Sequence, residues 1–271
     1  MTSREERYLH LDWYRLRDGS SALAAVYLAV ASELLPALVP ARFGTHEPWQ
    51  GRFPGDDAST FDRLYREECE ISELFIAGGN IQHGRVSGWT NDLEARYQRL
   101  SIRIDPEVLG GAVAQEALEA FFIEVAKRSG SFFASAELND TMFETAQAAP
   151  VRGAWAGLPP QPQWLTWYSP EYAELVETHL SAGESRKFAE GWFHRWTNEP
   201  ANATEILSWI WEKSWVPQEL LPTPNPGNTR RPHEQAYVMP ESLRAPVQGS
   251  PEWRRIEARY ARDADHREKH R

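Results

Sequence analysis

The sequence predicts an α+β fold, with a mixed, mainly antiparallel sheet and helices packed on one face of it. Three observations lead to this prediction. Residues 163–196 read as a strand, a helix and a second strand; residues 96–138 show the same order; and residues 7–35 read as a strand followed by a long helix. A chain that joins its strands both by helices and by tight turns is typical of α+β folds.

The amino-terminal elements are a strand and a helix. Arg7–Leu16 is rich in Tyr, Leu and Trp and is followed by Asp-Gly-Ser, which is the composition of a strand that ends in a turn. From Ser21 to Leu35 the apolar residues recur every three or four positions, which predicts a helix that ends at Pro36. Arg42–Ser59 continues neither period, so we expect a loop there.

The next stretch of the chain predicts a hairpin and then a second helical unit. Ile71–Ala77 and Ile81–Trp89 flank a Gly-Gly-Asn turn and are expected to pair. A helix over residues 108–128 carries one apolar face and is followed by Gly130. Strands at Arg96–Ile104 and Ser131–Leu138 flank this helix, and a short helix is predicted over Asp140–Ala148.

The central unit contains the clearest signals. Trp164–Tyr168 is aromatic and free of helix-breaking residues, and Ser169-Pro170-Glu171 offers a capping hydroxyl, a proline at the first helical position and an acidic first turn. The helix is expected to end near Ser181, with Gly183 in the left-handed conformation. After a charged turn over residues 184–187, a second aromatic strand can return beside the first. Because a capped Pro-Glu helix lies between two strands in each half, the sequence is compatible with a diverged duplication.

The carboxy-terminal part predicts one more helix and then a tail. Asn202 can cap a helix that carries Ile206, Trp209 and Ile210 on one face and ends before Pro217. Trp211 falls on the opposite face and is therefore the candidate for exposure. Prolines are frequent after residue 217 and charges are frequent after residue 253. We therefore expect a single α+β domain over residues 1–221 and a tail over residues 222–271.

Composition excludes several classes of protein. The formal net charge of −10 opposes binding to nucleic acid, whose phosphates require a cationic surface. The most apolar stretch, Ala22–Val39, is interrupted by Ser, Glu and Pro, which makes it a poor membrane span. The amino terminus lacks the pattern of a secretory signal, and Cys69 is the only cysteine. We expect a cytoplasmic protein whose partner is another protein of basic character.

Candidate chemistry is sparse. Arg42, His46 and Glu47 could serve acid-base catalysis, because a histidine beside a carboxylate titrates near neutral pH. Without a nucleophile, an interaction role is favoured for this loop, together with Trp49. The eight histidines show no metal-binding spacing, and His179 falls on the apolar stripe of its helix. No nucleotide-binding motif is present, so we expect no metal, no cofactor and no catalytic residue.

The central unit also resembles a known group of proteins. Residues 163–172, Gln-Trp-Leu-Thr-Trp-Tyr-Ser-Pro-Glu-Tyr, and 191–200, Gly-Trp-Phe-His-Arg-Trp-Thr-Asn-Glu-Pro, are similar to the carboxy-terminal pattern of bacterial immunity proteins of contact-dependent and type VI toxin systems. Gln163 and Trp192 replace two glycines of that pattern, and its Gly-Asp-x-Asn ending is absent here. The order of elements from residue 7 to residue 215 is similar as well, and Arg42–Pro48 resembles a stretch of actinobacterial proteins.

The resemblance implies a function in binding. Such immunity proteins neutralise a cognate toxin by occluding it, so the resemblance implies a toxin partner and no catalytic residues. The partner-binding residues that the sequence predicts are Arg42, His46, Glu47, Trp49 and Trp211. An acid-base hydrolase that uses the Arg42–Glu47 loop is the alternative.

Overall fold

The fold is that of a computed structural model, which describes most of the chain. The described residues are 7–16, 22–44, 48, 51–52, 74–87, 97–106, 112–139, 154–180, 182–210, 215–224, 233–255 and 257–258. The short helix predicted over Asp140–Ala148 lies outside them.

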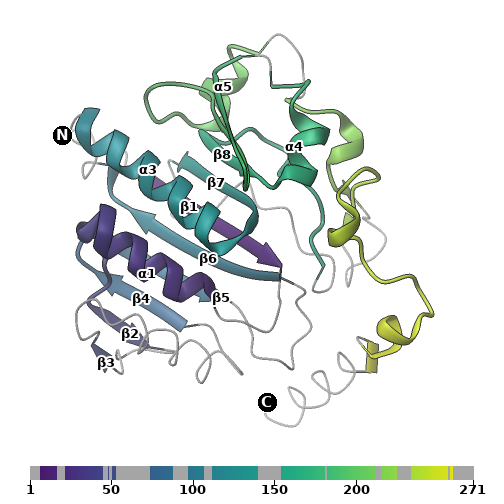
Figure 1. Ribbon diagram of the computed structural model, residues 1–271, viewed down its shortest axis with the longest axis horizontal. Helices are drawn as coiled ribbons and strands as arrows, with labels where there is room; N and C mark the ends of the chain where they lie inside the picture. Colours follow the sequence, from purple (N-terminus) through teal and green to yellow (C-terminus); the bar gives the residue numbers. More distant parts are fainter. Residues whose placement is uncertain are drawn as a thin grey trace, which may run out of the picture.

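The main sheet of the described part of the chain has ten strands (Figure 1). Every strand pair in it is antiparallel, which confirms the predicted α+β fold. In spatial order the strands are β3 (Gly51–Arg52), β2 (Arg42–Gly44), β4 (Leu74–Gly78), β5 (Ile81–Ser87), β6 (Tyr97–Ile104), β1 (Tyr8–Leu16), β7 (Ser131–Asn139), β8 (Leu165–Tyr168), β10 (Gly191–Arg195) and β9 (Glu184–Phe188).

The centre of the sheet is a split β-α-β unit. Strands β6 and β7 both pair antiparallel with β1, so they run parallel to each other with β1 between them. Helix α3 (Ala112–Ser129) makes the crossover between them, and α1 (Ala22–Leu34) packs beside it on the same face of the sheet (Figure 1). Two parallel strands of one sheet require a crossover of this kind, whereas the antiparallel pairs β4–β5 and β9–β10 need only tight turns.

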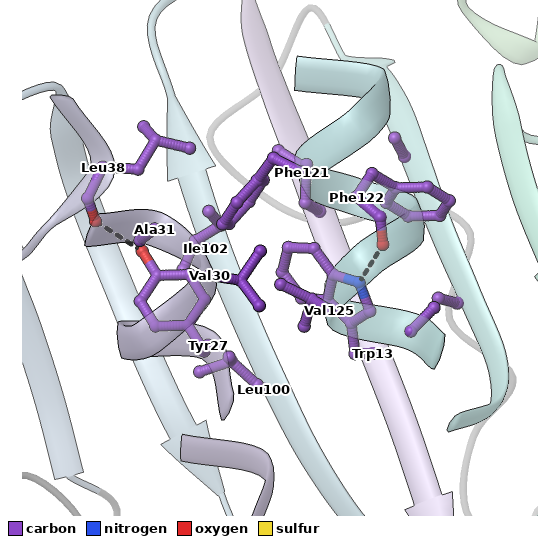
Figure 2. Close-up of a cluster of buried hydrophobic side chains, with 14 of the residues drawn as sticks. Trp13, Tyr27, Val30, Ala31, Leu38, Leu100, Ile102, Phe121, Phe122 and Val125 are labelled. Atoms are coloured by element: carbon purple, nitrogen blue, oxygen red, sulfur yellow. Dashed lines mark hydrogen bonds between the residues drawn. The ribbon is translucent and has the colours of Figure 1, made fainter. Parts of the chain in front are cut away.

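The first hydrophobic core lies between this face of the sheet and the two helices (Figure 2). Trp13 of β1 is fully buried at its centre, with its ring 5.7 Å from the rings of both Phe121 and Phe122. Its indole Nε1 donates to the carbonyl of Phe122 at 3.1 Å. Tyr27 of α1 is also fully buried, and its hydroxyl donates to the carbonyl of Leu38 at 2.7 Å. Both polar groups are thus satisfied, which avoids the cost of burying an unpaired donor.

A second core covers the opposite face of the sheet at its β7–β8–β10 end. Tyr168 and Trp192 point to this face because side chains alternate along a strand. They pack against Tyr172 and Val176 of α4 (Pro170–Val176) and against Trp155. Trp155 donates from Nε1 to the Tyr172 hydroxyl at 2.7 Å. The long helices thus lie on one face, and the short helix α4 lies on the other.

Polar side chains form a transverse row on this second face. Ser101, Asp12, Ser135, Thr166 and His194 occupy paired positions on β6, β1, β7, β8 and β10, and each is at most 7% exposed. Asp12 accepts from Arg99 at 2.8 Å, and both side chains of this pair are buried. A buried carboxylate requires such a partner, because its desolvation would otherwise exceed what the fold can compensate.

Three details of the sequence reading are wrong. The stretch after Arg42 was expected to be a loop, but it contains β2 and β3. The charged turn expected over residues 184–187 is strand β9, whose polar composition suits a strand at the edge of a sheet. Helix α4 ends at Val176, so His179 lies beyond it and is exposed rather than buried. The predicted left-handed Gly183 is confirmed, with φ of +84°.

The chain beyond Leu221 contributes to the second core. Two strands, β11 (Thr223–Pro224) and β12 (His233–Glu234), pair with each other. Met239 and Leu243 are buried in the second core, and Ala236 is buried as well. The 3-10 turns η3 (Gln218–Leu220) and η4 (Glu241–Leu243) flank these elements, and a third, η1 (Pro36–Leu38), follows α1. The Ala236 amide donates to the Ala156 carbonyl at 2.7 Å.

We propose that the stable unit extends past residue 221, and truncation tests this. A chain that ends at residue 221 loses the buried side chains of Met239 and Leu243 and should be less stable by about 2 kcal/mol, after the ordering entropy is subtracted. A chain that ends at residue 250 keeps both and serves as the control. Urea denaturation compares them, and equal stability of the two chains would place the boundary at residue 221.

Candidate partner-binding site

An open depression of about 660 Å³ lies where the chain leaves β10 and enters α5 (Ala203–Leu207). In Figure 1, α5 lies at the end of the molecule opposite β2 and β3. A volume of this size is sufficient for a side chain or a short segment of a partner. The depression is lined by Trp196, Thr197, Asn198, Glu199, Pro200, Ala201, Glu205, Ser208 and Trp209.

Hydrogen bonds fix the shape of this depression. The Thr197 carbonyl accepts from the buried indole of Trp164 at 3.0 Å, and the Thr197 hydroxyl donates to the Glu199 carbonyl at 2.5 Å. Asn202 and Glu205 then form a capping box, each accepting from the other's backbone amide at 2.9 Å. A box of this kind satisfies two amides that the first helical turn leaves free. The depression is therefore held in one conformation before any partner binds.

Trp209 is the exposed aromatic side chain of the site. Its side chain is 61% exposed, although its amide donates to the Ile206 carbonyl at 3.0 Å and Ile206 itself is buried in the second core. The backbone at Trp209 is thus fixed while the indole faces solvent. Exposed tryptophans that a rigid backbone presents are typical anchors of protein interfaces.

The charge of the depression is negative. Glu199 is exposed, and within the described part of the chain no cation pairs with its carboxylate. Glu205 differs, because one carboxylate oxygen accepts from Asn202 and the other lies 3.8 Å from Arg7. Glu199 is therefore the carboxylate that can receive a cation from a partner, whereas Glu205 holds the structure of the site.

Trp196 and His194 are two buried aromatic side chains at the site, and their rings pack against each other. Trp196 lines the depression and is 7% exposed, and none of the residues that the structure describes forms a hydrogen bond with its indole Nε1. Its ring packs edge-to-face on His194, with 4.6 Å between centroids. His194 is fully buried, and burial lowers the pKa of its imidazole to about 4 because the charged form would lose its hydration.

The structure brings one serine and one histidine together, but their surroundings do not resemble a catalytic site. Ser185 Oγ lies 2.9 Å from His194 Nδ1, while Nε2 is buried and has no hydrogen-bond partner among the described residues. In the described part of the chain no carboxylate contacts the imidazole to orient it, and a substrate cannot reach a ring that is fully buried. The contact is therefore structural. Among the residues that the structure describes, no cluster of three or more His, Cys, Asp or Glu could hold a metal ion.

The sequence-predicted binding residues are mostly outside the described residues. His46, Glu47, Trp49 and Trp211 belong to this group. Arg42 lies on β2, paired with Ala77 and Arg52, and is exposed.

Arg42 and the depression lie far apart. Six strands separate β2 from β10 in the sheet, and at about 4.8 Å for each of the seven steps this corresponds to about 34 Å. Arg42 and Trp209 therefore cannot contact the same small ligand, although a partner protein can reach across such a distance.

Sequence reasoning missed Trp209 and Glu199. It placed Trp209 on the apolar face of a helix that continues towards Pro217, but α5 ends at Leu207 and Trp209 lies in the turn that follows. Helical spacing therefore does not apply to it. The signal that was available is Asn198-Glu199-Pro200, a polar turn directly after an aromatic strand, and loops of this kind carry recognition residues.

Fold and site together describe an α+β protein with a preformed acidic depression and an exposed tryptophan at its rim. No helix of the described part of the chain is both long and apolar enough to cross a membrane.

Comparison with known proteins finds similarity in fold. No family model matches the sequence, and no curated protein matches it. Among solved structures the fold is similar to that of the T6SS protein PA0821 of Pseudomonas aeruginosa, with a TM-score of 0.51 and 12% sequence identity. The similarity covers 70% of this chain and 68% of that chain. At this identity the two proteins share a fold.

Proposed function

We propose that this protein is an immunity-type protein that binds a cognate bacterial toxin domain and neutralises it by occlusion. The observation that carries the proposal is the exposed Trp209, on a backbone held by hydrogen bonds, in the same depression as the unpaired carboxylate of Glu199. The resemblance of residues 163–200 to immunity proteins supports it, and so does the similarity in fold to a protein of a type VI secretion system.

Binding by occlusion requires affinity and speed but no chemistry in the immunity protein. A buried tryptophan can supply much of the affinity of an interface, and surrounding carboxylates accelerate the encounter with a basic partner. The net charge of −10 favours such a partner. The loop with Arg42, His46, Glu47 and Trp49 is proposed as a second contact for a toxin that is large enough to reach it.

The experiment starts from the gene that neighbours this one. If that gene encodes a toxin, the toxin is expressed alone and together with this protein. We expect co-expression to restore growth, and we expect the purified pair to elute from gel filtration as one complex. Continued toxicity with no complex would contradict the proposal. A neighbouring operon for biosynthesis, with no toxin, would instead favour an enzyme or accessory role.

A substitution then tests the site itself. Trp209→Ala should weaken toxin binding by about 30-fold or more, since central aromatic anchors contribute at least about 2 kcal/mol. Tyr237→Ala is the matched control, because Tyr237 is 81% exposed and does not line the depression. We expect the control to change affinity less than about 3-fold in calorimetry. Equal effects of the two substitutions would place the interface elsewhere.

A further inference from the structure

We infer that the depression receives an arginine side chain of the partner, with its guanidinium on the indole of Trp209 and paired with the carboxylate of Glu199. This inference rests on the proposed function and specifies the chemistry of the partner that the site recognises. The partner segment is therefore a protein loop that presents arginine.

Within the described part of the chain, no cation competes for the carboxylate of Glu199. Glu199 has no cation partner in the described part of the chain, and it does not take part in the capping box. The nearest capping carboxylate, Glu205, already accepts from the Asn202 amide. A cation that enters the depression therefore finds one carboxylate available and displaces no internal ion pair.

The indole of Trp209 offers an aromatic surface to a cation. Trp209 is 61% exposed, and tryptophan is the side chain that binds cations most strongly through its π face. The same chain pairs cations with aromatic rings elsewhere: Arg186 lies over Phe193 with 4.7 Å to the centroid, and Arg103 lies over Tyr8 with 4.8 Å. In those cases the ring is covered within the chain, whereas the ring of Trp209 is open to a partner.

The site favours arginine over lysine. Guanidinium is planar, so it can lie flat on the indole while its edge donates two parallel hydrogen bonds to one carboxylate. The ammonium of lysine is strongly hydrated and cannot satisfy both contacts with the same geometry. Because Trp209 and Glu199 both line one depression, the arrangement favours the planar cation.

The site loses little conformational entropy when it binds the arginine. Both residues belong to a backbone that hydrogen bonds already hold, through the Thr197 contacts and the capping box. Preformed sites lose less conformational entropy on binding than flexible ones. The affinity for the arginine is therefore not offset by folding of the site.

The first experiment needs no toxin. The blocked peptide acetyl-Gly-Arg-Gly-amide is titrated into the full chain and followed by the indole N–H resonance of Trp209 in NMR, which is assigned with Trp209→Phe. The same peptide with citrulline, a neutral analogue of arginine, and the peptide with lysine are the comparisons. We expect a saturable shift with arginine, at least about 5-fold weaker binding of lysine, and no saturation with citrulline. Equal binding of arginine and citrulline, or a shift that spares Trp209, would overturn the inference.

Variants separate the two contacts. Glu199→Gln should weaken binding of the arginine peptide by about 5- to 10-fold. Glu190→Gln removes the same charge at an exposed position in the turn before β10 and should leave the binding unchanged. At position 209 the order of affinity should be Trp, then Phe, then Leu, because only the first two offer a π face. Equal losses for the two Glu variants would reduce the effect to net charge and refute a specific pair.

The neighbouring toxin distinguishes failure of this inference from failure of the proposed function. If the toxin is neutralised but Glu199→Gln and Trp209→Leu bind it with unchanged affinity, the inference is wrong and the immunity function stands. If the arginine peptide binds as expected but no toxin is bound or neutralised, the chemistry of the site stands and the immunity function is wrong.

Discussion

Trp13→Ala should destabilise the fold by about 3–5 kcal/mol, the range measured when large aromatic residues are removed from a packed core. Trp13 is 0% exposed, and its ring contacts those of Phe121, Phe122 and Tyr27. The substitution removes these contacts, leaves a void between sheet and helices, and deletes the hydrogen bond to the Phe122 carbonyl. Urea denaturation followed by circular dichroism measures the loss.

The matched control is the same chemical change at an exposed position. Trp209→Ala removes a side chain that is 61% exposed, so the free energy of unfolding should change by no more than about 0.5 kcal/mol. Trp13→Phe should lie between the two, because it retains most of the volume but loses the hydrogen bond. A Trp13→Ala protein as stable as Trp209→Ala would show that the first core does not hold the sheet and helices together.

Stability should fall when the pH is lowered from about 7 to about 4, and His194 should account for about 3 kcal/mol of that fall. The pKa of His194 is about 4 in the folded chain, against about 6.5 in an unfolded one. Between these values the unfolded state binds a proton that the folded state excludes, so protonation favours unfolding. The contribution is constant above about pH 7, where the imidazole is neutral in both states.

A comparison of variants separates the pH dependence of stability caused by His194 from that caused by the carboxylates. His194→Phe cannot titrate, so its stability relative to the unmodified protein should improve by about 3 kcal/mol between pH 7.5 and pH 4. His179→Gln, a change at an exposed position, should show the same pH dependence as the unmodified protein. Denaturation at several pH values provides the measurement. Parallel curves for His194→Phe and the unmodified protein would show that the imidazole is protonated in the fold.

The edge of the sheet beside the site is itself protected from strand pairing. Strand β9 is the last strand at this end, and it carries Glu184, Arg186 and Lys187. Arg186 pairs with Glu119 of α3, and Arg195 of β10 pairs with the same carboxylate at 2.8 Å. Charged edge strands disfavour addition of a further strand. A partner is therefore not expected to bind this end of the molecule by adding a strand to the sheet.

Local signals in the sequence determined most of the elements. The aromatic and β-branched composition of β1, β6 and β8, and the helical spacing of α1 and α3, depend on neighbours within a few residues, so they are readable without a fold. The caps at Ser169 and Asn202 are equally local, and the structure shows both accepting the expected amides. The α+β class follows from the order of these elements.

Only the tertiary structure decided which side chains meet and which remain exposed. The sequence contains no sign that β1 inserts between β6 and β7, because this pairing joins residues at least 81 positions apart. The charged residues of β9 have the composition of a turn, but they form a strand because they pair with β10. Helical spacing placed Trp209 on the apolar face of its helix, but α5 ends at Leu207, and Trp209 is exposed in the depression that Glu199 also lines. Exposure and proximity depend on contacts between distant segments, and local pattern does not contain them.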